Sequence, residues 1–112
     1  MPYISEDRRK PLDSCIAELV LCLKNNVDQN KSPFRLEHLS NEEFLAIIGD
    51  INYTFSRTIS ALMGDVSYSK IAMITGVLEN IKQEYYRRIA AVYENKKIIE
   101  KGDIKEYKIF PQ

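Results

Sequence analysis

One amphipathic stretch determines the expected architecture. It reads KIAMITGVLENIKQEYYRRIAAV and occupies positions 70–92. Large apolar side chains recur in it every three or four residues, at Ile71, Ile74, Leu78, Ile81, Tyr85, Ile89 and Val92. This spacing is close to the heptad seam of packed helices. Such a helix is about 35 Å long, whereas a compact chain of this size has a radius of gyration of about 13 Å. The helix therefore spans the whole molecule or projects beyond it.

The sequence on either side of this run sets the bounds of the helix. Ser69 can cap it, and the helical pattern continues to a stop at Gly102, so we predict a helix over residues 70–101. Residues 103–112 then alternate in polarity, which predicts an extended C-terminal tail.

A second helix is predicted over residues 41–63. Ser40 and Glu43 form a capping box before its apolar stripe, and Gly64 is a natural stop. Gly49 lies inside and weakens the helix by about 1 kcal/mol relative to alanine, so we expect a close helix crossing there. The stripe comprises Phe44, Ile48, Ile51, Phe55, Ile59 and Leu62.

A third helix is predicted earlier in the chain, over residues 11–26, because Pro11 suits a first helical turn. Before it, residues 1–10 are predicted to be an extended start and a turn, in which Ser5 can cap Glu6. Residues 27–39 form the longest segment without a pattern and are predicted to be a loop.

Together these elements predict an all-α single domain over residues 1–112. We expect a small helical bundle built on a long antiparallel hairpin of the helices at 41–63 and 70–101, covered by the helix at 11–26. A small monomer has difficulty covering both sides of such a hairpin, so we also expect a homo-oligomer.

Composition narrows the classes of function. The 112 residues are 45% apolar and carry 16 basic and 16 acidic side chains, which gives a net charge of zero. General nucleic-acid binding needs a basic excess that is missing here. No apolar run approaches the length of a membrane span, and the polar start is no secretory signal. We therefore expect a cytoplasmic protein without a membrane partner.

Chemistry-bearing residues are few. Cys15 and Cys22 lie two turns apart on one side of a helix, too far to bond to each other, and are predicted to be buried in a reduced, intracellular protein. His38 is the one histidine, and these three residues lack a paired zinc-ligand signature. We expect no catalytic residue, no metal and no cofactor. Scattered acids such as Asp50 and Glu84 leave a weak metal-dependent hydrolase as a third hypothesis.

The densest functional cluster is Tyr85-Tyr86-Arg87-Arg88. Aromatic rings beside guanidinium groups can stack on a base and grip a phosphate. The alternative is structural: Tyr85 belongs to the core, and Arg88 pairs with Glu84 one turn earlier.

A second cluster places Tyr53 and Arg57 one turn apart on the helix at 41–63, with Asp50 in reach of Arg57. In an antiparallel hairpin Arg57 approaches Arg87 and Arg88, and an anion would be needed among three arginines. The alternative is an ordinary polar face paired with Asp50 and Glu84.

A third surface is lined by Tyr86, Ala90, Tyr93 and Lys97. Tyrosines around a small residue can form a flat contact for a protein partner, or they can cover the tail.

Several motifs resemble one small uncharacterised family of phages and prokaryotes. They are MPYI with Asp7-Arg8, GDINY at 49–53, GVLE at 76–79, EYYRR at 84–88, YENKKI at 93–98 and GDI at 102–104. The resemblance implies a complete unit and supplies no reaction, and a phage setting implies a protein that blocks or sequesters a host component.

The leading expectation is a non-enzymatic oligomeric protein in which Arg57, Arg87 and Arg88, with Tyr53 and Tyr86, bind a phosphate-bearing small molecule such as a nucleotide. The alternative is an adaptor or inhibitor of a host protein that uses Tyr86, Tyr93 and the C-terminal tail.

Overall fold

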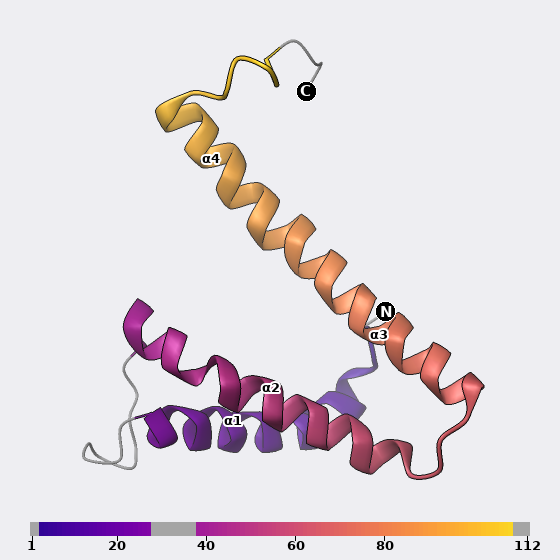
Figure 1. The fold of residues 1–112 in the computed structure, drawn as a ribbon. Helices are drawn as coiled ribbons and strands as arrows, with labels where there is room; N and C mark the ends of the chain where they lie inside the picture. The colour runs from indigo at the N-terminus through magenta and orange to yellow at the C-terminus, as the bar shows by residue number, and fades with distance from the viewer. Residues whose placement is uncertain (1–2, 28–37, 109–112) are drawn as a thin grey trace. The chain divides into compact units, whose positions relative to one another are not determined.

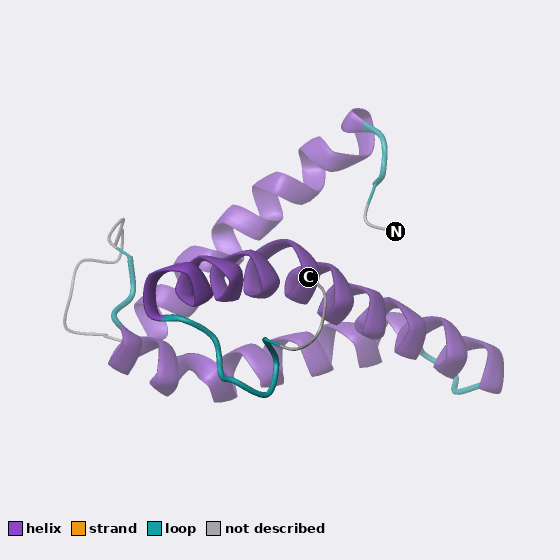
Figure 2. Cartoon of the chain, turned by 90° about the horizontal axis from the view of Figure 1, so that it is seen from above, coloured by secondary structure: helices purple, strands orange, loops and turns teal. Residues whose placement is uncertain are grey.

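The chain is all-α, as its sequence predicts. The computed structural model describes residues 3–27 and 38–108, and within them it contains helices and no strand. The predicted loop at 28–37 and the last residues of the tail, 109–112, lie outside the described residues. The helices are α1 (Glu6–Val27), α2 (Asn41–Met63), α3 (Tyr68–Tyr85), η1 (Tyr86–Ala90) and α4 (Ala91–Lys101), as Figures 1 and 2 show.

Contacts divide the chain into two units. One holds α1 and α2, and the other holds α3, η1 and α4. Each unit is described by itself. The predicted hairpin joins α2 to α3 across this division, so the hairpin and the single domain stay predictions.

The first helix begins earlier than predicted. α1 starts at Glu6, where the backbone N–H groups of Arg8 and Arg9 both donate to the Ser5 carbonyl at 3.1 Å. Pro11 therefore lies inside the helix and not at its start. Its missing N–H leaves the Asp7 carbonyl without that helical bond. The acidic side chains of Glu6 and Asp7 favour an N-terminus at this point, because the helix dipole is positive there.

α1 and α2 run in opposite directions (Figure 1) and pack through a small apolar contact. Ile47 is 2% exposed and is the one buried side chain among the residues that the structure describes. Leu19 and Leu23 of α1 are half-buried, and Asn26 Nδ2 donates to Asp50 Oδ2 at 3.0 Å. The contact thus uses one end of α1 and a narrow face of α2.

Most of the predicted stripe on α2 is not part of this contact. Ile51 and Ile59 are half-buried, but four members stay exposed: Phe44, Ile48, Phe55 and Leu62. Ile47 points about 100° away from Ile48 around the helix axis. The contact with α1 therefore lies beside the stripe. One further expectation is wrong here, because Cys15 and Cys22 are exposed free thiols. Within the described part of the unit of α1 and α2, no atom lies within 4 Å of a Cβ built on Gly49, so α1 does not cross closely there.

The predicted ends of α2 are confirmed. The Ser40 hydroxyl accepts from the Glu43 N–H at 3.2 Å, and the Ser40 N–H donates to Glu43 Oε1 at 3.0 Å. At the other end Gly64 takes a φ of 61° and donates to the Ser60 carbonyl. Local capping chemistry therefore defines this helix at both ends.

The long helix is continuous from residue 68 to 101 but is not uniformly α-helical. Ser67, and not Ser69, caps it: the Ser67 hydroxyl accepts from Lys70 N–H at 3.2 Å, so the helix starts two residues early. The C-terminal stop at Gly102 is confirmed, with φ 83°. The tail is not simply extended, because Tyr107 N–H donates to the Ile104 carbonyl at 3.1 Å and closes a turn.

Between α3 and α4 the helix widens into the π-helical turn η1. The Ala91 N–H donates to the Tyr86 carbonyl, five residues back rather than four. This turn adds one residue to the helical repeat and shifts α4 relative to a continuous α-helix. A regular three-and-four spacing does not predict it.

Candidate functional site

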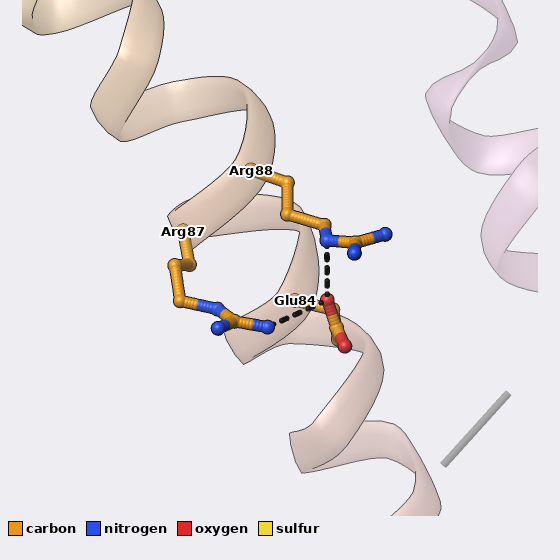
Figure 3. Close-up of polar contacts among 3 residues, drawn as sticks. All are labelled: Glu84, Arg87 and Arg88. Carbon is orange, nitrogen blue, oxygen red and sulfur yellow. Dashed lines mark hydrogen bonds and ion pairs between the residues drawn. The ribbon is translucent and has the colours of Figure 1, made fainter. Parts of the chain in front are cut away.

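The π-helical turn carries three of the five predicted site residues, Tyr86, Arg87 and Arg88. Figure 3 shows both arginine side chains reaching back to Glu84, on the last turn of α3. Arg87 Nη2 lies 3.1 Å from Glu84 Oε2, and Arg88 Nε lies 3.3 Å from the same oxygen. One carboxylate oxygen thus pairs with two neighbouring guanidinium groups.

Charge and exposure set the character of this cluster. Two cations share one anion, so the three side chains carry a net charge of +1. The arginine side chains are 71% and 61% exposed, whereas the Glu84 side chain is only 18% exposed beneath them. The predicted structural pairing of Arg88 with Glu84 is confirmed, and Arg87 joins it. As exposed ion pairs they stabilise the helix by only a few tenths of a kcal/mol each.

Tyr86 makes a contact that depends on the π-helical turn. Its hydroxyl donates to Glu94 Oε2 at 3.4 Å, eight residues along the chain. In a regular α-helix residues eight apart point about 80° away from each other. The extra residue of η1 absorbs this difference and brings both side chains to one side. Glu94 was not among the predicted site residues, because eight-residue spacing is no α-helical signal. Such turns are frequent at functional sites.

Tyr53 and Arg57 contact each other on α2, as their one-turn spacing predicts. Arg57 Nη1 donates to the Tyr53 hydroxyl at 3.5 Å, and the guanidinium carbon lies 5.9 Å from the ring centroid. Arg57 also borders an open surface depression with Ser56, Ser60 and Ala61. Asp50, expected near Arg57, takes a hydrogen bond from Asn26 of α1.

The convergence of Arg57 with Arg87 and Arg88 stays a prediction. Arg57 belongs to the unit of α1 and α2, and the other two arginines belong to the unit of α3 and α4. The structure therefore contains two separate clusters, one on each unit.

The third predicted surface also contains a local contact. Lys97 Nζ lies 5.4 Å from the Tyr93 ring centroid and 3.3 Å from Glu100 Oε2. A cation over an aromatic face beside a carboxylate is a common arrangement on exposed helices. The Tyr93 ring is part of an exposed surface.

Metal chemistry finds no support in the described residues. No group of three or more histidine, cysteine or acidic side chains is placed to hold a metal ion within residues 3–27 and 38–108. Asp50 and Glu84, the acids of the hydrolase hypothesis, lie on different units. Across the same residues, no helix has the length and apolar character needed to cross a membrane.

Comparisons with known proteins give one match. Neither the curated proteins nor the solved structures yield a significant similarity. A family model described as a domain of unknown function (DUF6899) matches residues 1–104, nearly the whole chain and all four α-helices. This agrees with the resemblance to an uncharacterised family, and the chain belongs to the DUF6899 family.

Proposed function

We propose that this chain is a non-enzymatic, self-associating helical protein that binds a phosphate-bearing small molecule such as a nucleotide. Arg87, Arg88 and Tyr86 would form the main contact, joined by Arg57 and Tyr53. The observation that carries the proposal is the pair of guanidinium groups held on one Glu84 oxygen at 3.1 and 3.3 Å.

The chemistry of the arginine pair suits a phosphate. Each guanidinium offers five N–H donors in a planar fork, and Arg87 uses Nη2 for Glu84. A phosphate can accept from the outward edges, where bidentate, charge-assisted hydrogen bonds are the strong ones. The net charge of +1 on the three side chains favours an anion.

Tyr86 supplies the second half of the recognition. Its side chain is exposed, and its hydroxyl donates to Glu94 Oε2 at 3.4 Å. An exposed ring can stack on a base, which is worth about 1–3 kcal/mol per base in single-strand binding proteins. We therefore expect a nucleotide to bind more tightly than inorganic phosphate.

The test is titration calorimetry of the full chain with ATP, adenosine and inorganic phosphate. We expect ATP to bind and adenosine to bind far more weakly. Arg87→Ala and Arg88→Ala should each weaken ATP binding about 10- to 100-fold, the value of a charge-assisted hydrogen bond. Arg8→Ala, which removes the same charge from an exposed position on α1, should leave affinity unchanged. Equal affinity in all variants, or no binding of any phosphate compound, would contradict the proposal.

An adaptor or inhibitor of a host protein is the second candidate. It is favoured by the exposure of Tyr86 and Tyr93 on the same long helix, because tyrosine is enriched at the centres of protein interfaces. We also propose a cytoplasmic location and a phage-type role in which the protein blocks or sequesters a host component. A chain that binds no phosphate compound in the titration would direct attention to this candidate.

A further inference from the structure

The π-helical turn η1 decides which side of α4 continues the apolar row of α3. In a regular α-helix, Val92 and Ile99 lie within about 20° and 40° of the line through Tyr85 and extend that row. The extra residue of η1 turns the residues that follow it back by about 100°. Tyr93 and Lys97 then lie within about 20° of the same line, whereas Val92 and Ile99 lie well away from it.

The two rows of α4 that exchange places in this way differ in chemistry. The observed row is polar, because Lys97 Nζ lies over the Tyr93 ring at 5.4 Å and pairs with Glu100 at 3.3 Å. The other row is apolar, and its members Val92 and Ile99 are exposed side chains. One extra residue in the helix therefore separates a polar continuation of α3 from an apolar one.

Packing inside the unit of α3, η1 and α4 does not hold the extra residue in place, because no residue of η1 is buried. The backbone also stays in the α-helical region: φ lies between −60° and −65° at Tyr86, Ala90 and Ala91. The π-helical and α-helical registers are therefore separated by small changes in backbone angle.

A side-chain contact that depends on the π-helical register is the hydrogen bond from the Tyr86 hydroxyl to Glu94 Oε2. Its length of 3.4 Å and its exposed position make it weak. In the α-helical register the two residues point about 80° apart, so the hydrogen bond is lost. The α-helical register instead restores the common i→i+4 repeat, in place of the rare i→i+5 repeat.

We propose that η1 is a register switch, in which the long helix exchanges between the observed π-helical form and a continuous α-helix. The exchange rotates α4 by about 100° around the helix axis relative to α3. The Tyr86–Glu94 hydrogen bond favours the π-helical form. A partner that binds one row of α4 would shift the populations towards the form that presents that row. This inference does not depend on the proposed ligand.

NMR couplings across hydrogen bonds measure the register of the full chain directly. The Ala91 N–H is coupled to the Tyr86 carbonyl carbon in the π-helical form and to the Arg87 carbonyl carbon in the α-helical form. We expect the coupling to Tyr86 to be the stronger one. Tyr86→Phe should shift the population ratio towards the α-helical form about two- to tenfold, the equivalent of one hydrogen bond. Tyr85→Phe, the same change on the neighbouring exposed ring, should leave the ratio unchanged.

Deletion of Ala90 gives a form without a choice of register. The helix is then α-helical throughout, and Ala91 lies four residues after Tyr86 and donates to the same carbonyl. Tyr86 and Glu94 become seven residues apart, which keeps them on one side of the helix. Tyr86→Phe in this background should not move the coupling to another carbonyl. The melting temperature should equal or exceed that of the full chain, because only the extra residue of the π-helical turn is lost.

Two results would overturn the inference. One is a population ratio in the full chain that Tyr86→Phe leaves unchanged, whichever carbonyl the coupling reaches. The other is a marked loss of stability on deletion of Ala90, since this would mean that packing requires the extra residue. Neither result bears on ATP binding, which the titration measures separately.

Discussion

Two glycines of this chain differ in backbone geometry, and the difference decides their role. Gly64 ends α2 with φ 61°, in the region that side chains of L-residues rarely adopt. Gly49 lies in the middle of the same helix, with open space around the position of a Cβ. The first glycine is required by the turn, whereas the second weakens the helix without a packing reason inside the described part of its own unit.

We therefore expect opposite effects from one substitution. Gly49→Ala should stabilise the protein by about 0.5–1 kcal/mol, because alanine loses less backbone entropy in a helix. Gly64→Ala should destabilise it by about 1–2 kcal/mol, because alanine is strained at positive φ. Urea unfolding of both variants measures the two signs. A destabilised Gly49→Ala protein would show that another surface packs closely against this position in solution.

At the level of elements, the long helix combines a regular seam with one irregular turn. Its α-helical part follows from spacing, but η1 rearranges the side chains around Arg87 and Arg88. Glu84 holds both arginines on one oxygen. By contrast, Glu79 on the same helix meets Lys82 at 4.0 Å and accepts a hydrogen bond from Gln83.

This contrast predicts unequal costs for the same chemical change. Glu84→Gln removes two ion pairs at i+3 and i+4 and should cost about 0.5–1 kcal/mol of stability. Glu79→Gln keeps a hydrogen-bonding amide and loses one weak pair, so it should cost a few tenths of a kcal/mol or less. Thermal melts followed by circular dichroism compare the two. Equal melting points would mean that the Glu84 contacts contribute nothing measurable.

At the scale of the whole molecule, a chain with 45% apolar residues buries one side chain within the described residues, Ile47. Large apolar side chains stay exposed on the stripe of α2 and along α3. The proposed self-association would cover part of them. Assembly and stability should therefore be linked, and stability should rise with protein concentration.

Neighbouring isoleucines test where the core lies. Ile47→Ala should cost about 2–4 kcal/mol, the usual effect of truncating a buried isoleucine. Ile48→Ala, at a side chain 53% exposed, should cost less than about 1 kcal/mol. Urea unfolding at two protein concentrations measures both. A large cost at Ile48 that grows on dilution would reveal that the α2 stripe is also an interface between chains.

Much of the local structure was determined by sequence alone. Ser40 with Glu43, Gly64 and Gly102 mark helix ends through bonds within a few residues, so their outcome does not depend on distant contacts. The pairs Glu84–Arg88 and Tyr53–Arg57 follow from helical spacing in the same way. The errors at Pro11 and Ser69 are local too: α1 already begins at Glu6, and the Ser67 hydroxyl caps α3.

Three-dimensional structure decided what spacing could not. The π-helical turn breaks the repeat on which such predictions rest, so spacing alone does not pair Tyr86 with Glu94. Ile47 rather than Ile48 became the buried residue because α1 packs beside the stripe, and the exposure of Cys15 and Cys22 follows from that same small contact. Amphipathic spacing shows that a helix needs a partner, but only packing determines which of its faces is covered.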